Sequence, residues 1–384
     1  MNLGGQLVPA LATQVSSLLC SVAAHGLDSQ HGEGQETFAF ISRPLSPPDW
    51  RSLLGAARHE RLLGLLARAV ADGALPATVE QAAELHEAYL ADLCRDLICE
   101  RQLIEIVQAL RHAGLDHRVL KGSAVAHLDY PEPALRSFAD VDLLVRADQW
   151  DDAIPVLADA GWQRQFGEPR PGFDRRFVKG VVLTRIDGDT RTELDLHRTL
   201  ALGPFGLTVR LADLWDRFDV LQLGGEELRC LEAEERFLHA CFHAVLGDFP
   251  PRLVPLRDIA EMSLTKDLDL DLVIELSRSW QAQAVLICAV QLSWATLNLD
   301  CSAEPWNRVN LLEPPRRELR ALRPYLSAKR SYVGLCLAAT RAIRRPSDKV
   351  RYLTAMAFPR RQFVAARYRS RIARWRAAAQ VLRS

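Results

Sequence analysis

The spacing of hydrophobic residues in the first third of the chain is helical. From Val79 to Ala113 apolar residues recur at intervals of three and four, which predicts one long helix that ends at Gly114. A second apolar stripe starts near Trp50, where Ser46 or Asp49 can cap the helix. The apolar stretch from 7 to 24 predicts a further short helix. We therefore expect an N-terminal helical layer.

The pattern then changes to the alternation that strands show. Val119 and Leu120 form a short buried strand, and a second strand carries Asp140 and Asp142. A helix is expected over 147–160, with a proline inside it that can kink it. These elements predict a sheet in the middle of the chain.

Two more strands follow, over 177–186 and 191–200. The segment Asp-Gly-Asp-Thr at 187–190 joins them and is typical of a hairpin turn. In the second of these strands Leu194 and Leu196 alternate with polar residues, so the leucines are expected to face the core.

The remainder of the chain returns to helical spacing, interrupted by prolines. The fold class predicted is α+β: a small mixed sheet flanked by N-terminal and C-terminal helical regions. The expected divisions are an extension, a helical layer, a sheet-containing core, a helical domain and a basic helical region, over 1–48, 49–114, 115–228, 229–315 and 316–384.

Composition narrows the class of protein. The 384 residues are 48% hydrophobic and 25% charged, which is ordinary for a globular chain with a sizeable core. The eight cysteines form no C-x-x-C pair, which argues against a zinc site and a disulfide framework. No apolar run is long enough to span a bilayer, and no Lys or Arg precedes the apolar N-terminal stretch. We expect a soluble, cytoplasmic protein.

The net charge is zero but unevenly distributed. Residues 316–384 contain 19 Lys or Arg and two acids, a net charge of +17, so the preceding residues sum to −17. Such a basic region can bind nucleic acid, an anionic membrane surface or an acidic partner. We favour the alternative that its arginines pair with the acidic body of the same chain.

The acids of the second strand predict a cation site. Asp140 and Asp142 are two positions apart, so they point to the same face of a strand. At about 6 Å and an effective dielectric near 20, two carboxylates repel each other by about 3 kcal/mol. A fold that fixes them together therefore usually supplies a cation.

A third carboxylate and a phosphate-binding turn complete the set. Glu193, Asp195 and His197 share the polar face of their strand. Gly122 and Ser123 form a turn at the start of a helix, where free N–H groups and the helix dipole suit a phosphate. Carboxylates that hold Mg²⁺ beside such a turn are the parts needed for two-metal phosphoryl or nucleotidyl transfer.

These motifs carry a resemblance to a known family. Gly122-Ser123, Asp140-Val141-Asp142 and Leu194-Asp195-Leu196 resemble the pattern of the DNA polymerase beta-like nucleotidyltransferase superfamily. More closely, the chain is similar to the bacterial uncharacterised nucleotidyltransferase family, some members of which occur in gene clusters for peptide natural products. The similarity extends over most of the chain.

The resemblance implies a role for each matching residue. Asp140, Asp142 and Asp195 would be the catalytic metal ligands, and Gly122 and Ser123 would hold the triphosphate. Lys121 and Arg136 would be further contacts to phosphate or neutralise charge. Sixteen residues separate Ser123 from Asp140, which is longer than the common interval in the superfamily.

Other residues near these motifs keep alternative interpretations. Glu193 replaces Asp195 as a ligand if the strand register differs. His197 either lines the site or serves as a structural hydrogen-bonding partner. His239 and His243 are four apart on a helix, but Ala240 stands where a zinc protease has Glu, so we interpret both as core residues.

The functional prediction is a nucleotidyltransferase that uses Mg²⁺ or Mn²⁺ and an NTP, ATP being the favoured one. It would move a nucleoside monophosphate to a hydroxyl or phosphate of a small molecule, peptide or protein. The alternative is a non-catalytic binding protein with the same fold, which holds a partner or RNA through its basic C-terminal region. Nucleic acid is the less favoured partner.

Overall fold

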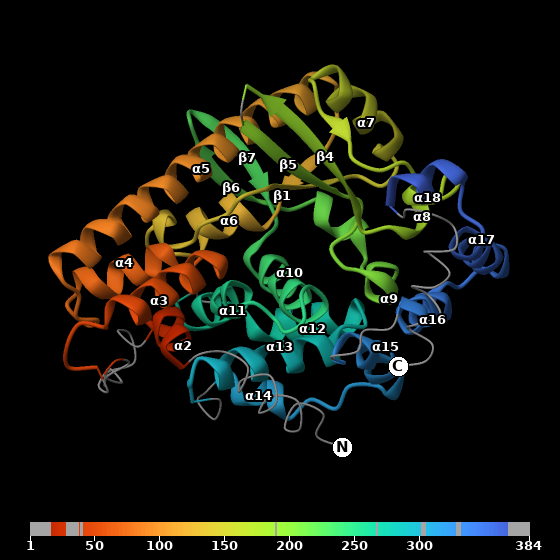
Figure 1. Cartoon of the computed structure of the whole chain (residues 1–384). Coiled ribbons are helices and arrows are strands. Elements are labelled where there is room, and N and C mark those ends of the chain that lie inside the picture. Colours follow the sequence, from red (N-terminus) through yellow and green to blue (C-terminus); the bar gives the residue numbers. More distant parts are fainter. Residues whose placement is uncertain are drawn as a thin grey trace.

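The computed structural model describes residues 17–27, 38, 41–188, 190–265, 268–300, 305–327 and 332–367. A mixed sheet forms the upper part of the molecule in Figure 1, and a bundle of helices lies below it. The sheet has seven strands in the order β3-β4-β5-β2-β1-β7-β6. Their bounds are Gln163–Arg164 (β3), Gly180–Asp187 (β4), Thr190–His197 (β5), Val141–Val145 (β2), His117–Val119 (β1), Glu226–Cys230 (β7) and Asp219–Leu223 (β6).

The centre of the sheet combines antiparallel and parallel pairs. β2 runs antiparallel to β1 and parallel to β5, whereas β4 runs antiparallel to β5 along its full length. β7 continues the sheet from β1 and forms a hairpin with β6. The two central strands that carry the acids are therefore neighbours.

One face of the sheet packs on helices α5 (Val79–His112) and α7 (Trp150–Asp159). Thr78 caps α5, and its side chain and that of Gln81 complete a capping box. Alternate residues of β2 and β5 point into this core with the second half of α5, where the buried residues are Leu103, Ile106, Val107, Leu143, Val145, Leu194 and Leu196. Because strands have a period of two, Asp142, Asp195 and His197 must lie on the opposite face.

The opposite face looks toward a larger helical core. That core combines helices from the N-terminal part of the chain with the helices after the sheet. The helices before and within the sheet region are α2 (Ser17–Ala24), α3 (Pro47–His59), α4 (Leu63–Ala71), α6 (Lys121–Leu128), α8 (Asp174–Phe177) and α9 (Gly203–Gly206). Those below the sheet are α10 (Ala233–Leu246), α11 (Leu253–Thr265), α12 (Leu270–Ser279), α13 (Gln283–Thr296) and α14 (Asn307–Asn310).

The C-terminal helices, blue in Figure 1, lie beside α8 and α9. They are α15 (Arg316–Leu322), α16 (Tyr332–Ala342), α17 (Pro346–Ala357) and α18 (Arg361–Arg367). A small apolar cluster fixes them there, in which Tyr352 stacks on Phe173 with ring centroids 5.8 Å apart. The basic region is thus packed against the sheet-containing part of the protein.

The α+β fold class is confirmed, and so is the long helix, which spans Val79–His112. The hairpin β6–β7 was not expected, although Gly224-Gly225 between alternating segments is its signal. Most of the helix expected over 7–24 lies outside the described residues, and α2 occupies its end. The division into domains stays a prediction. None of the described helices combines the length and apolar character that a bilayer crossing requires.

Candidate active site

Parallel pairing of β2 and β5 brings two of the predicted acids together. Asp142 is directly opposite Asp195 in the register of the two strands. Asp142 is buried, whereas about a quarter of the Asp195 side chain is exposed. Asp140 lies one residue before β2 rather than within it. The site therefore has two acids fixed by the sheet and a third fixed by the preceding loop.

His197 joins the two acids of the sheet. Its Nε2 is 2.9 Å from Asp142 Oδ1 and 3.0 Å from Asp195 Oδ2. The ring is fully buried, and Nδ1 has no hydrogen-bond partner among the described residues. The alternation of β5 predicted that His197 shares the polar face of the strand with Asp195. In the structure its ring lies directly beside the two acids.

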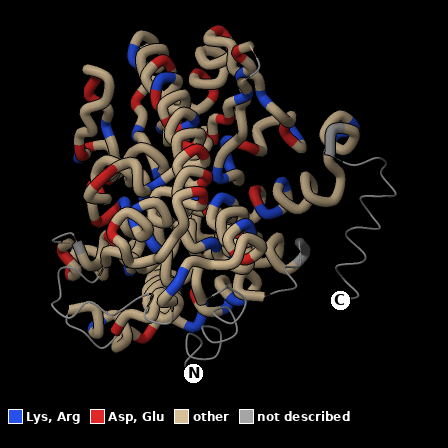
Figure 2. The backbone as a smooth tube through the Cα atoms, turned by 60° about the vertical axis from the view of Figure 1, so that its left-hand side comes forward, with Lys and Arg blue, Asp and Glu red and all other residues tan. Residues whose placement is uncertain are grey.

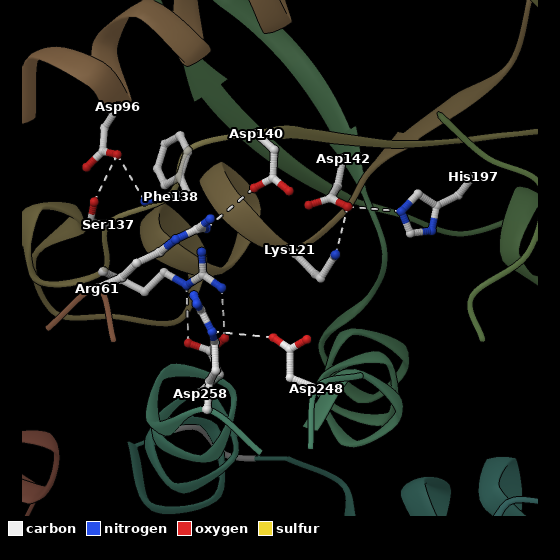
Figure 3. A network of polar contacts seen from close by, with 12 residues as sticks. Arg61, Asp96, Lys121, Ser137, Phe138, Asp140, Asp142, His197, Asp248 and Asp258 are labelled. Carbon is white, nitrogen blue, oxygen red and sulfur yellow. Dashed lines mark hydrogen bonds and ion pairs between the residues drawn. The ribbon is translucent and has the colours of Figure 1, made fainter. Parts of the chain in front are cut away.

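Lys121 makes the closest contact with Asp142. Its Nζ is 2.7 Å from Asp142 Oδ1, and its side chain is 11% exposed (Figure 3). The backbone of Lys121 has φ 27°, which is strained for a residue with a Cβ. This turn directs the ammonium group toward the strand that carries the acid.

Gly122 and Ser123 follow Lys121 at the start of α6, as predicted. Gly122 also has φ 27°, in the region that favours glycine. A Cβ on Gly122 would lie 3.6 Å from both the Phe138 ring and the Asp140 carbonyl. The turn is therefore packed directly against the loop that leads to the acids.

Two further cations neutralise the remaining acids. Lys179 Nζ is 3.2 Å from Asp195 Oδ2, and Arg61 Nη1 is 3.5 Å from Asp140 Oδ1. Arg61 occupies the turn between α3 and α4 with φ 58°, and Lys179 immediately precedes β4. Neither residue was singled out from the sequence: Arg61 lies in a separate helical segment, and Lys179, 16 residues before Asp195, immediately precedes the partner strand of the hairpin.

The surrounding charges separate the pKa values of the three carboxyl groups. Burial alone would raise the pKa of Asp142, but Lys121 and His197 outweigh it and hold that pKa well below its usual range. For Asp195, His197 and Lys179 likewise outweigh burial and lower the pKa. Burial and the neighbouring Asp142 instead raise the pKa of Asp140. Asp142 and Asp195 are therefore the most firmly ionised acids of the site.

A buried carboxyl group on α5 fixes the loop before Asp140. Asp96 Oδ1 accepts hydrogen bonds from Phe138 N at 2.9 Å and from Ser137 Oγ at 3.2 Å (Figure 3). Burial raises the pKa of Asp96 to about 7. Gly64 lets α4 approach the same loop, since a Cβ there would collide with the Ala134 carbonyl. The position of Asp140 thus depends on both helices.

Arg136 forms a buried ion pair away from the acids of the sheet. Its Nη2 is 2.9 Å from Asp258 Oδ2, and its Nε is 3.2 Å from Asp258 Oδ1. Tyr130 donates a hydrogen bond to the same carboxylate at 2.8 Å. The guanidinium of Arg136 therefore connects the loop to α11, and its expected contact with phosphate stays a prediction.

The remaining candidates take structural positions. Glu193 lies at the start of the polar face of β5, where it pairs with Arg191 at 2.9 Å. The His239 ring meets the His197 ring edge-on at 6.0 Å. Burial lowers the pKa of both His239 and His243, so both rings are neutral parts of α10.

The donor set fits a divalent cation. One ligand atom from each of Asp142, Asp195 and His197 lies within 4.8 Å of the others, and this is the one such group among the described residues. No donor among the described residues forms a hydrogen bond with Asp142 Oδ2 or Asp195 Oδ1. Carboxylate oxygens suit Mg²⁺ and Mn²⁺, and an imidazole nitrogen favours the second of these.

Comparison with solved structures gives two weak similarities. One is a crystal structure of the lincosamide antibiotic adenylyltransferase LnuA with lincomycin bound, at 16% identity and a TM-score of 0.29, covering 42% of this chain and 95% of that one. The other is an antigenic nucleotidyltransferase-like protein from Paracoccidioides brasiliensis, at 16% identity and a TM-score of 0.33, covering 54% and 94%. No curated protein matches the chain.

A family model gives the decisive comparison. It is described as "Uncharacterised nucleotidyltransferase" and matches residues 46–298 of the 384. The matched segment begins before α3, includes every strand of the sheet and ends after α13. The resemblance noted in the sequence is therefore confirmed, and the chain belongs to the uncharacterised nucleotidyltransferase family, a family of transferases.

Proposed function

We propose that the protein transfers a nucleoside monophosphate from an NTP, preferably ATP, to a hydroxyl or phosphate group of a small molecule or peptide. The observation that carries this proposal is the pairing of Asp142 with Asp195 across β2 and β5, beside the turn at Lys121-Gly122. We also propose a cytoplasmic location, because NTPs are found there and the described cysteines are free thiols.

Asp142, Asp195 and His197 would hold the cation, and Asp140 would complete the set from the loop. A bound Mg²⁺ or Mn²⁺ supplies positive charge to the phosphate oxygens and lowers the pKa of the attacking hydroxyl. The fit is supported by the two carboxylate oxygens that receive no hydrogen bond from the described residues.

The protein's own residues would position the triphosphate. Backbone N–H groups after Gly122, at the start of α6, and the Ser123 hydroxyl would bind phosphate oxygens. Lys121 already has its ammonium group at Asp142, so a phosphate brought beside it would share that charge. Arg136 would be a further phosphate contact only after a rearrangement of its pair with Asp258.

The transfer step needs no reactant other than the NTP and the acceptor. The acceptor oxygen forms a bond to the α-phosphorus, the bond from that phosphorus to the bridging oxygen breaks, and pyrophosphate leaves. Asp195 would accept the proton of the acceptor hydroxyl, since it is ionised and is more exposed than Asp142.

The test is incubation of the protein with each α-labelled NTP and Mg²⁺ or Mn²⁺ in a small-molecule and peptide extract. A labelled product and a matching release of pyrophosphate are expected. Asp195→Asn should abolish both signals. Glu193→Gln is the matched control, because Glu193 lies on the same strand and pairs only with exposed Arg191 among the described residues.

A failure to bind any NTP in the presence of either metal would contradict the proposal. The alternative function, a non-catalytic binding protein, is favoured by one observation: no Lys or Arg of 316–327 or 334–365 pairs with an acid within 4 Å in the described structure. Salt-sensitive RNA binding that survives Asp142→Asn and Asp195→Asn would support that alternative.

A further inference from the structure

A pocket of about 280 Å³ lies between α9 and the C-terminal helices. Pro204 and Phe205 of α9 form one wall, and Ala321 and Ala338 contribute apolar surface from α15 and α16. Four arginines line the same pocket, two from α15 and two from α16 and the residues that follow it: Arg317, Arg320, Arg341 and Arg344.

These four arginines, the pocket arginines, have no ion-pair partner among the described residues. No carboxylate oxygen there lies within 4 Å of their side-chain nitrogens, although thirty other ion pairs are present. The one acid that lines the pocket is Glu318, which is 4% exposed and accepts a hydrogen bond from Ala284 N at 3.1 Å. Its carboxylate is therefore directed toward the start of α13.

No Lys or Arg of 316–327 or 334–365 forms an ion pair with the acidic body in the described structure. Figure 2 shows few acidic positions on the helices that lead to the C-terminus. Asp348 and Arg176 form an ion pair at 4.0 Å that joins these helices to the body. In this pair the basic region supplies the acid and the body supplies the arginine. Internal compensation, the interpretation that we favoured from the sequence, stays a prediction, because the basic residues after 367 lie outside the described residues.

The pocket is separate from the acids of the sheet. Its lining includes none of Asp140, Asp142 and Asp195. The Phe205 ring is 6.2 Å from that of Phe242 on α10, the helix that also presents His239 to the active site. A ligand in this pocket would therefore not occupy the proposed nucleotide position.

Guanidinium groups recognise phosphate and carboxylate oxygens through paired N–H donors. Four of them around one concave site repel one another unless an anion lies between them. The apolar wall at Phe205 suits a flat or hydrophobic part of the same molecule. A bare inorganic ion would leave the apolar wall at Phe205 without a contact.

We propose that this pocket binds a small organic anion, which places a phosphate or carboxylate group among the pocket arginines and its apolar part against Phe205. The proposal concerns binding at a second site and does not depend on the transferase activity. A nucleic acid is a different occupant, which the experiment separates.

The experiment is calorimetric titration of the full chain at low salt with phenyl phosphate and with benzoate. Saturable binding of at least one is expected, and the tighter of the two identifies the anionic group. In R317A/R344A the affinity should fall by at least about tenfold, since two charged hydrogen bonds are lost. The matched control is R316A/R345A, which removes two exposed arginines adjacent to these in sequence but outside the pocket.

Binding by the control that stays within about twofold of the unaltered protein supports the proposal. Equal losses in both double variants would overturn it, because they would indicate attraction to net charge alone. Absence of saturable binding to either probe, or displacement of the probe by saturating ATP and Mg²⁺, would also overturn it. So would binding of an RNA oligonucleotide without binding of either probe.

Circular dichroism of each variant checks that it is folded. If R317A/R344A does not fold, R320Q/R341Q removes the other two pocket arginines and takes its place, with the same expected loss. Arg323→Gln is then the control on the same segment, since Arg323 is exposed and does not line the pocket.

Discussion

Two charged regions of this protein differ in whether their charged side chains form ion pairs. In the active site every acid has a cationic neighbour: Lys121 at Asp142, Lys179 at Asp195, and Arg61 at Asp140. No carboxylate oxygen of the described residues lies within 4 Å of a side-chain nitrogen of the pocket arginines, although Glu318 lines the same pocket. A ligand that binds to paired charges must first displace their partners in the protein, whereas unpaired charges attract a ligand directly. The two regions should therefore respond differently to mutation.

The largest effect is expected at the active site. Asp142→Asn should reduce nucleotide transfer by at least about a thousandfold, because a cation would lose a ligand and Lys121 and His197 would lose their buried acid. Pyrophosphate release at saturating NTP measures the loss. An active Asp142→Asn protein would contradict the assignment of the site.

A large loss of stability is expected at the buried pair beside the site. Arg136→Met should lower the free energy of unfolding by about 3–5 kcal/mol, since Asp258 would remain buried without its partner. Urea unfolding measures it. The control is Arg111→Ala, which breaks an exposed pair with Glu226 and should cost about 0–1 kcal/mol. Similar losses in both variants would show that burial of the pair does not matter.

The next effect is pH dependence at Asp96. Its pKa is about 7 in the folded protein and about 4 when unfolded, so the folded state binds the additional proton between these values. The contribution of Asp96 to the free energy of unfolding should therefore fall as pH rises from about 4 to about 7, whereas His239 and His243, whose pKa values burial lowers, contribute in the opposite direction. Asp96→Asn should remove the contribution of Asp96 and keep the contacts with Ser137 and Phe138, because the amide oxygen also accepts hydrogen bonds.

Comparison of Asp96→Ala with Asp96→Asn separates the effect of the hydrogen bonds of Asp96 from the effect of its titration. Asp96→Ala should lower the free energy of unfolding by about 1–3 kcal/mol at pH 5, since Phe138 N loses its buried acceptor. Chemical unfolding at pH 5 and pH 7 measures both variants. Glu235, whose pKa burial also raises to about 7, retains its own slope in each of them. An unchanged slope in Asp96→Asn would show that Asp96 is ionised throughout.

The smallest effect is expected at the pocket arginines. R317A/R344A should change the free energy of unfolding by no more than about 0.5 kcal/mol, because both side chains are exposed and form no ion pair in the described structure. Thermal unfolding in low and high salt measures it. A large loss would mean that these arginines hold the C-terminal helices in place, and the contrast between the two regions would disappear.

Local patterns predicted most of the architecture. The strand alternation placed Leu194 and Leu196 in the core and Asp195 on the opposite face, and helical spacing predicted α5 almost to the residue. The two acids also fall together as expected, because a parallel register links Asp142 to Asp195. These features depend on periodicity alone, which one sequence contains in full.

Two of the partners of the acids, Arg61 and Lys179, were not predicted from the sequence. Arg61 comes from a helical turn almost eighty residues before Asp140, and Lys179 follows a short helix that no pattern marked. The pair between Arg136 and Asp258 likewise joins a loop to a helix that lies 122 residues later in the chain. Such contacts depend on how the layers pack, and the +17 charge of 316–384 does not specify them either.

The most direct test of the central claim is titration of Mn²⁺, followed by electron paramagnetic resonance, in the presence of a non-hydrolysable ATP analogue. The account predicts saturable Mn²⁺ binding by the unaltered protein and by Glu193→Gln, and its loss in Asp142→Asn and Asp195→Asn variants that remain folded. Mn²⁺ binding that is unchanged in both aspartate variants would contradict the assignment of Asp142 and Asp195 as the metal site.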